Sequence, residues 1–220
     1  MDETVRDFGL GRLPAVDERD AGYRMASVLP SDAPPRTYRY WTPQRPTLNQ
    51  LRTSSCVGQA WSQWAACGPV RNVGIDPYEV YAASQLVDEW PGEAYDGTSV
   101  RAGAKVMQGR GLVTGYVWGD DAETIGAFIL TTGPVVLGTR WFGKMFYPDE
   151  RGFVVPEGWD AGGHAYLATG YSRTRGVFRL QNSWGEAWGD SGRFWLLGEH
   201  LDQLIRDQGE ACAALEVRSG

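Results

Sequence analysis

Hydrophobic residues recur with a helical period in the first half of the chain. Apolar positions at i, i+3, i+4, i+7 and i+8 begin at Val57, and they predict a buried helix that starts at Ser54 or Ser55 and stops before Gly68-Pro69. Capping residues and glycine stops predict three further helices, at about 77–88, 99–108 and 121–131. The first half of the chain is therefore expected to be mainly helical.

After Gly133-Pro134 the pattern changes to short apolar runs rich in Val, Phe, Tyr and Leu. Such runs predict strands, which we place at 135–137, 165–171, 177–180, 194–197 and 212–217. The turn-forming residues 172–176 predict a hairpin between two of them. A helical half followed by an antiparallel half indicates an α+β fold, drawn best as two lobes with a cleft between them.

Residues 1–37 show neither period and mix charges with glycine and proline. This composition predicts an extended arm that lies on another surface, with the packed body starting near Tyr38. The expected organisation is an arm (1–37), a helical lobe (38–115) and a sheet lobe (116–220).

Composition excludes several classes of protein. The 220 residues are 42% hydrophobic and 22% charged, which is typical of a folded globular protein. A net charge of −6 without a basic stripe argues against nucleic acid as a partner. No apolar run is long enough to span a membrane, and the N-terminus lacks the pattern of a signal peptide. Metal-ligand spacings are missing, so we expect no metal and no other cofactor.

The three cysteines are Cys56, Cys67 and Cys212. An odd, scattered set cannot form a disulfide framework and leaves at least one free thiol. Cys56 falls in the first turn of the predicted helix, where free N–H groups and the helix dipole stabilise a thiolate. It is a candidate nucleophile, although a small buried hydrophobic role fits the same position. Cys67, expected farther along the same helix, and Cys212 fit that second role better.

Only two histidines occur, His164 and His200. His200 belongs to a predicted helix with an apolar stripe, which favours a packing or solvated role. His164 follows Gly162-Gly163 at the start of a predicted strand, where the edge of a lobe can meet a cleft. Any mechanism that uses histidine therefore favours His164, although a structural role fits this position too.

Three segments together resemble the papain-like cysteine peptidases. They are Asn49–Cys56 (NQLRTSSC), Gly162–Ala165 (GGHA) and Gln181–Gly192 (QNSWGEAWGDSG), in the family's order of Cys, then His, then Asn-Ser-Trp-Gly. The resemblance runs from about Tyr38 to Leu197. It implies a two-lobed papain-like fold, with a helical lobe followed by an antiparallel β-barrel-like lobe and the active site in the cleft between them.

The resemblance also implies a role for each matching residue. Cys56 would be the nucleophile, His164 the general base and later acid, Asn182 the group that orients the imidazole, and Gln50 a donor to the oxyanion. The implied reaction is hydrolysis of peptide bonds in a polypeptide substrate through a thioester acyl-enzyme. The implied substrate-binding residues are Gly97, Gly163 and Trp184, and Trp184 would also shield the His164–Asn182 hydrogen bond.

The sequence departs from the family pattern around the nucleophile. The usual Cys-Gly-Ser-Cys-Trp is replaced by Thr53–Val57 (TSSCV), and the secreted disulfide set is missing. The chain thus resembles the disulfide-poor branch found in bacteria and their viruses, and we expect it in the cytoplasm or in a virus particle.

Two other functions stay open on the sequence. The same Cys-His pair would serve a cell-wall amidase or an acyl transferase. Alternatively, the fold could be a catalytically idle binding or assembly module, for example in a virus particle. The arm is expected to lie along the cleft or to contact a partner protein.

Overall fold

The protein is described by a computed structural model that covers residues 8–15, 17–32, 36–90, 92 and 94–215. In this part of the chain, seven antiparallel strands form one sheet in the order β2-β7-β3-β4-β5-β6, with β1 beside β4. The strands are β1 (Tyr38–Tyr40), β2 (Gly115–Trp118), β3 (Val135–Phe142), β4 (Asp160–Ser172), β5 (Val177–Gln181), β6 (Arg193–Leu197) and β7 (Glu210–Leu215). The α+β fold is confirmed, but this sheet is open and does not close into a barrel.

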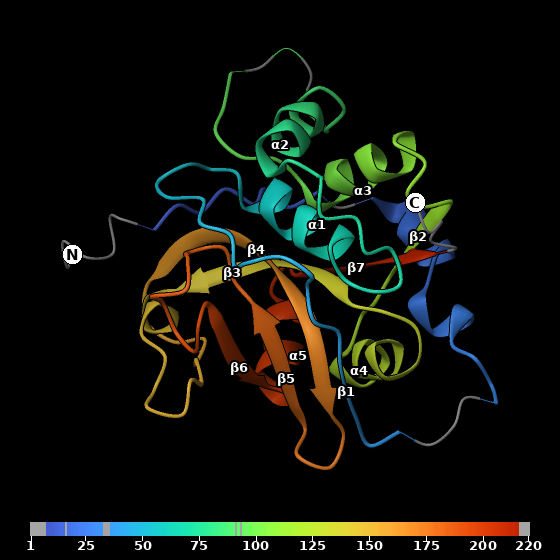
Figure 1. Cartoon of the computed structure of the whole chain (residues 1–220), viewed down its shortest axis with the longest axis vertical. Helices are drawn as coiled ribbons and strands as arrows, with labels where there is room; N and C mark the ends of the chain where they lie inside the picture. Colours follow the sequence, from blue (N-terminus) through green and yellow to red (C-terminus); the bar gives the residue numbers. More distant parts are fainter. Residues whose placement is uncertain (1–7, 16, 33–35, 91, 93, 216–220) are drawn as a thin grey trace.

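Helices cover both faces of the sheet (Figure 1). Helices α1 (Cys56–Ala65), α2 (Pro77–Gln85) and α3 (Val100–Gly109) gather on one side, and α4 (Ala122–Thr131) and α5 (Gly198–Arg206) lie on the other. Each side has its own apolar core: one surrounds α1, and a second, rich in aromatic rings, lies beneath α4 and α5. This is the two-lobed arrangement expected from the sequence.

Helix α1 is buried along its whole length, including Gln59 and Gln63. The sequence predicts a single apolar stripe, but strand β4 and helices α2 and α3 enclose the helix on several sides. The packing is close: a Cβ at Gly103 of α3 would lie 2.1 Å from the Trp61 ring. Burial of this kind fixes the position of the first residue of α1, Cys56.

Local signals locate most of the other helices. Asp76 caps α2 by accepting hydrogen bonds from the amides of Tyr78 and Glu79, and Pro77 occupies the first helical position. The helix ends at Gln85, three residues before its predicted end. Strand β2 has no counterpart among the predicted strands; its four residues pair with β7 and begin at the predicted lobe boundary.

Strand β4 begins at Asp160, five residues before its predicted start. His164 therefore lies inside a strand and not at its beginning. Gly162 and Gly163 do not interrupt the strand, which is continuous from Asp160 to Ser172. A Cβ at Gly163 would lie 2.0 Å from the Arg12 carbonyl oxygen. The missing side chain permits a close backbone approach within the strand.

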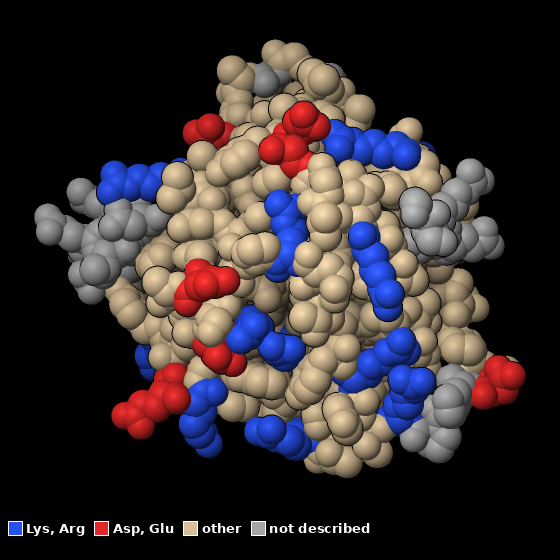
Figure 2. Space-filling model, in the orientation of Figure 1, with Lys and Arg blue, Asp and Glu red and all other residues tan. Residues whose placement is uncertain are grey.

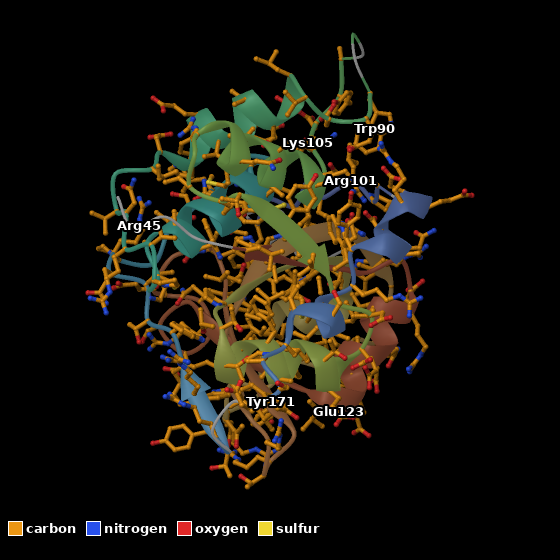
Figure 3. The ribbon with its side chains drawn as sticks, turned by 90° about the vertical axis from the view of Figure 1, so that its right-hand side faces the viewer. Arg45, Trp90, Arg101, Lys105, Glu123 and Tyr171 are labelled. Atoms are coloured by element: carbon orange, nitrogen blue, oxygen red, sulfur yellow. The ribbon has the colours of Figure 1, made fainter. Side chains whose placement is uncertain are left out.

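The sequence predicts that the packed body begins near Tyr38, but in the structure it begins earlier, within the arm. Within the arm, Met25 is fully buried in the core. Residues 18–22 and 25–28 form short 3₁₀ helices, η2 and η3. Arg101 of α3 (labelled in Figure 3) donates hydrogen bonds to both carboxylate oxygens of Asp20 and stacks over Trp118. These contacts join residues far apart in the sequence, so no local period reveals them.

Charge is unevenly distributed over the surface. On the face shown in Figure 2, basic side chains spread across the molecule, and most acidic ones lie in its upper part and its left half. The net charge of −6 therefore does not describe each face.

Candidate active site

Cys56 is the first residue of α1, directly after the N-cap Ser55. Its thiol is fully buried, and burial raises the pKa of Cys56 to about 12. Backbone hydrogen-bonding groups of Ala165 and Val57 act in the opposite direction, towards the thiolate. The contact with Ala165 brings the sulfur next to the residue that follows His164.

His164 is also fully buried. Its Nε2 lies 2.7 Å from Oδ1 of Asn182, and its Nδ1 has no hydrogen-bond partner among the described residues. Burial lowers the pKa of His164 to about 4, although the hydrogen bond with Asn182 opposes this shift. With both side chains buried, the Cys56 thiol and the His164 imidazole are neutral near pH 7.

Asn182 follows directly after β5, and its side-chain oxygen makes two hydrogen bonds, while its Nδ2 has no hydrogen-bond partner among the described residues. Its Oδ1 also accepts a hydrogen bond of 2.8 Å from the amide of Ser183. This second bond orients the amide so that the oxygen faces the His164 ring. The ring nitrogen that faces Asn182 is therefore the donor, and Nδ1 is the acceptor of the neutral imidazole.

Aromatic rings surround this hydrogen bond. Trp184 stacks on His164 with ring centroids 4.7 Å apart and planes inclined by 22°. Trp188 meets Trp184 edge-on at 5.0 Å. Trp141 of β3 lies 5.0 Å from the imidazole in an edge arrangement. Trp141 was not among the candidates selected from the sequence, because only the pairing of β3 with β4 brings it to the site.

Gln50 is buried and fixed by two hydrogen bonds. Its Nε2 donates to the carbonyl of Thr53 at 2.8 Å, and its Oε1 accepts from the hydroxyl of Ser183 at 2.6 Å. Since Ser183 follows Asn182, one short segment holds both Gln50 and the partner of His164. The amide nitrogen of Gln50 consequently points towards the turn that precedes Cys56.

Residues 8–13 of the arm run between Thr98, which precedes α3, and Gly163 of β4. The amides of Gly11 and Arg12 donate to the carbonyl of Gly163 at 2.9 and 3.0 Å. The amide of Thr98 donates to the carbonyl of Gly11, and that of Leu13 donates to the carbonyl of Thr98, both at 2.9 Å. The segment is thus hydrogen-bonded to the helical side and to the sheet side at once.

The same segment approaches Gln50 and Trp184. The Gly9 carbonyl accepts a 3.0 Å hydrogen bond from Trp184 Nε1, and the Phe8 ring lies 4.7 Å from the Trp184 ring. A Cβ at Gly9 would lie 3.0 Å from Gln50 Nε2. A pocket of about 600 Å³ remains beside these contacts, and its lining residues are Phe8, Asn49, Leu51, Arg52, Thr53 and Trp184.

Gly97 lies at a second close backbone approach. It has a positive φ of 102°, and a Cβ there would lie 2.3 Å from the Gly11 carbonyl oxygen. No other residue type could adopt this backbone without displacing the arm. Gly97, Gly163 and Trp184, selected from the sequence, therefore all contact residues 9–12.

The remaining candidates lie apart from this cluster. Helix α1 ends at Ala65, so Cys67 lies beyond its C-cap and not on the helix as predicted. Cys67 and Cys212 are buried free thiols, and burial raises the pKa of both. His200 lies on α5. The described residues contain no group of three or more His, Cys, Asp or Glu side chains that could hold a metal ion.

Among the described residues, no helix is both long and apolar enough to cross a lipid bilayer.

Solved structures with the same fold come from bacteria, plants and insects. Xylellain, a cysteine protease of Xylella fastidiosa, has a TM-score of 0.72 at 19% identity, and the match covers 97% of this chain and 98% of that one. The ragweed pollen cysteine protease Amb a 11 in its proform has a TM-score of 0.68 at 16% identity (99% and 71% covered). Procathepsin L2 of Tenebrio molitor has a TM-score of 0.66 at 17% identity (98% and 81% covered).

Sequence comparisons agree with this similarity. Cathepsin B-like cysteine proteinase 5 of Caenorhabditis elegans is 25% identical over 161 residues, which are 63% of this chain and 47% of that protein. The chain therefore spans about half the length of this curated relative. In addition, the family-wide sequence model of the papain family cysteine proteases matches residues 53–210, most of the chain. The chain belongs to the papain family of cysteine proteases.

Proposed function

We propose that this chain is a cysteine peptidase that hydrolyses peptide bonds with Cys56, His164, Asn182 and Gln50. The observation that carries the proposal is the 2.7 Å contact between His164 Nε2 and Asn182 Oδ1. It leaves Nδ1 as the acceptor of the neutral ring, while the next residue, Ala165, contacts the Cys56 sulfur. Nucleophilic catalysis by a thiol requires a nearby base with an acceptor nitrogen, and His164, the residue before Ala165, supplies such a nitrogen in this proposal.

Each step of the reaction has a residue to perform it. Cys56 gives its proton to His164 Nδ1 and attacks the carbonyl carbon of the substrate. The protonated His164 then donates that proton to the leaving amine, and a thioester remains on Cys56. Water attacks the thioester, with His164 accepting its proton and returning it to the sulfur. Asn182 keeps the ring orientation constant throughout.

In this proposal, two N–H groups stabilise the negative charge on the carbonyl oxygen. The amide of Gln50 carries two N–H groups, and the bond to the Thr53 carbonyl uses only one. The backbone N–H of Cys56 lies at the start of α1, where helix amides lack intrahelical partners. Donors of this kind typically contribute about 10²–10³-fold to the rate each.

We infer that residues 8–13 keep this site closed. The segment uses the backbone groups of Gly163 and Thr98 that an extended substrate would need. It also lies over the turn before Cys56, since a Cβ at Gly11 would lie 2.2 Å from the Ser54 carbonyl oxygen. Displacing the arm would admit water, which would lower the free-energy cost of forming the charged Cys56 thiolate and His164 imidazolium. Of the three similar structures named above, one is a procathepsin and one is a proform, and their matches cover 98–99% of this chain.

Labelling with a thiol-directed epoxide tests the assignment of Cys56 and His164. The chain would carry Gly11→Ala, which cannot keep the arm in place without strain, and mass spectrometry would locate the label. We expect Cys56 to react faster than free cysteine and the reaction to slow when His164→Ala is added. The buried thiols of Cys67 and Cys212 serve as internal controls. The proposal would be contradicted if Cys56 were labelled no faster than free cysteine. It would also be contradicted if His164→Ala left the labelling rate of Cys56 unchanged.

A further inference from the structure

Strands β1, β5 and β6 share a surface that bears exposed aromatic rings, which we call the outer face. Strand register aligns four positions across it: Tyr40 lies opposite Gly170, Gly170 opposite Arg179, and Arg179 opposite Trp195. The Tyr40 ring lies over Gly170, since a Cβ there would be 2.0 Å from the ring. Tyr40 is 39% exposed, and Tyr38, on the same face two residues earlier, is 65% exposed.

The segments that form the outer face are basic. Residues 36–47, 161–185 and 193–197 contain no Asp, Glu or Lys and carry seven arginines. These are Arg36, Arg39, Arg45, Arg173, Arg175, Arg179 and Arg193. Within the described part of the chain, the one ion pair that they form joins Arg193 to Asp190 at 3.7 Å. Figure 2 shows basic side chains over β1 and β5, so this face attracts anions.

Arg179, at the centre of the outer face, has no counterion. Its Cζ lies 5.2 Å from the centroid of the Tyr40 ring, and its guanidinium has no hydrogen-bond or ion-pair partner among the described residues. Burial and the nearby charge of Arg193 lower the pKa of Arg179. An anion bound beside these two arginines would relieve their mutual repulsion.

A pocket of about 150 Å³ adjoins the aligned positions. Gln181 and Arg193 line it and are paired across β5 and β6. They lie two positions from Arg179 and Trp195 respectively, and therefore on the same face of the sheet. Arg45, labelled in Figure 3, lines the pocket from the segment that follows β1. Two guanidinium groups thus meet at one small pocket.

Both arginines have N–H groups without an acceptor among the described residues. Nε of Arg193 is buried and has no hydrogen-bond partner. Arg45 donates through Nη1 alone, to Ser62 Oγ at 2.7 Å and to the Ile75 carbonyl at 3.0 Å. Glu186 also lines the pocket, but it is exposed and forms no ion pair with either arginine. A carboxylate from outside would satisfy these donors through charge-assisted hydrogen bonds.

The size of the pocket distinguishes between kinds of polyanion. The carboxylate of a Glu or Asp side chain ends a flexible stem, so it can enter a space of this size. A phosphodiester is flanked by two sugars, and the carboxylate of an acidic sugar is attached directly to its ring, so neither can be inserted in this way. The net charge of −6 also disfavours a long, uniformly charged nucleic acid. Tyr, Trp and Arg together are typical of the residues that dominate binding between proteins.

We propose that the outer face binds an acidic polypeptide segment, with a Glu or Asp side chain in the pocket between Arg45 and Arg193 and neighbouring residues on Tyr40 and Trp195. None of the residues that line this pocket lines the pocket beside Trp184. The outer face is therefore a second polypeptide-binding surface, and it does not depend on the peptidase function.

Fluorescence anisotropy with a short labelled peptide of alternating glutamate and alanine tests the proposal. The full chain would carry Cys56→Ala to prevent cleavage, and the same peptide with glutamine in place of glutamate is the matched control. We expect the glutamate peptide to bind at least about tenfold more tightly than the glutamine peptide. Arg193→Gln should weaken its binding about 3–10-fold. Arg206→Gln, at the end of α5 and on the other side of the sheet, should leave the binding unchanged.

Equal binding of the glutamate and glutamine peptides would overturn the proposal, as would binding that Arg193→Gln leaves unchanged. The comparison of the two peptides is decisive even if the Arg193→Gln chain fails to fold. An oligodeoxythymidine of equal charge that binds as tightly as the glutamate peptide would also overturn it, because the face would then recognise nucleic acid. Failure of Cys56 labelling would refute only the peptidase function, since this binding does not use the thiol.

Discussion

At the scale of single residues, the orientation of His164 depends on one side-chain hydrogen bond and on the rings around it. Asn182 accepts from Nε2, while Trp184 stacks on one face of the imidazole and Trp141 meets it edge-on. The rings keep water away from the bond, which strengthens it. During the proposed reaction this bond would become charge-assisted, because the ring is then an imidazolium.

Replacing Asn182 by alanine should therefore reduce kcat more than it changes KM. A hydrogen bond to a charged group contributes about 1.5–3 kcal/mol, so we expect kcat to fall about 10–150-fold. The measurement is steady-state peptide hydrolysis by the chain carrying Gly11→Ala. Asn72→Ala is a suitable control, because Asn72 is not part of the candidate active site and its Oδ1 accepts a hydrogen bond from the amide of Gly74. A rise in KM with unchanged kcat would contradict the orienting role.

Burial of His164 also predicts a dependence of stability on pH. Its pKa is lowered to about 4 from an ordinary value of 6.5, so the unfolded chain binds a proton more readily than the folded one. The contribution is complete above pH 6.5 and is lost as the pH falls towards 4, by about 3 kcal/mol. Urea unfolding of the wild type and of His164→Gln between pH 4 and 8 checks this. Equal pH dependence of the two unfolding free energies would refute it.

At the scale of elements, the arm and α3 show how glycine permits close packing. Gly11 combines a φ of +141° with a space that a Cβ would fill. Gly22, in the same arm, has open space instead, since a Cβ there would have no heavy atom within 4 Å. Alanine substitutions at Gly11 and Gly22 therefore distinguish the closure of the site from general effects on the arm.

Gly11→Ala should accelerate labelling of Cys56 at pH 7, whereas Gly22→Ala should not. The alanine carbon would lie 2.2 Å from the Ser54 carbonyl oxygen, so the arm must move. Because burial raises the pKa of Cys56 to about 12, the opened site should also label at lower pH than the closed one. Epoxide labelling over a range of pH measures both effects. Identical profiles for the two variants would show that the arm does not control access to the thiol.

The packing of α3 on α1 gives a second prediction at this scale. A Cβ at Gly103 would lie 2.1 Å from the Trp61 ring, whereas Gly109 of the same helix has open space. Gly103→Ala should lower the free energy of unfolding by about 1–3 kcal/mol through overpacking. Gly109→Ala should raise it by about 0.5–1 kcal/mol, since alanine favours a helix more than glycine does. Denaturant unfolding measures the free energy of unfolding of both variants. A Gly103→Ala chain as stable as the unsubstituted one would contradict the described packing.

At the scale of the whole molecule, the parts of the fold that depend on local pattern were predictable from the sequence. Caps, helical periods and the Gly133-Pro134 break located the helices and most strands. The selection of Cys56, His164 and Asn182 relied on motif order. The structure brings His164 and Asn182 together and places Ala165 beside Cys56, while their catalytic roles remain predictions.

The features that were not predictable from the sequence depend on long-range contacts. Arg12 of the arm forms an ion pair with Glu210 of β7, 198 positions away, and Trp141 reaches His164 only through strand pairing. The close backbone approaches at Gly97 and Gly163 likewise involve the arm, whose residues have no period of their own. Such features follow from the tertiary fold, which local patterns do not specify.

The most direct test of the central claim is cleavage of an unfolded protein by the Gly11→Ala chain, with purified peptidoglycan as a parallel substrate. We predict new peptide termini in the unfolded protein, identified by mass spectrometry, and none when Cys56→Ala is added. Cleavage that persists without the Cys56 thiol would contradict the account. So would an enzyme that leaves the polypeptide intact and digests only the peptidoglycan.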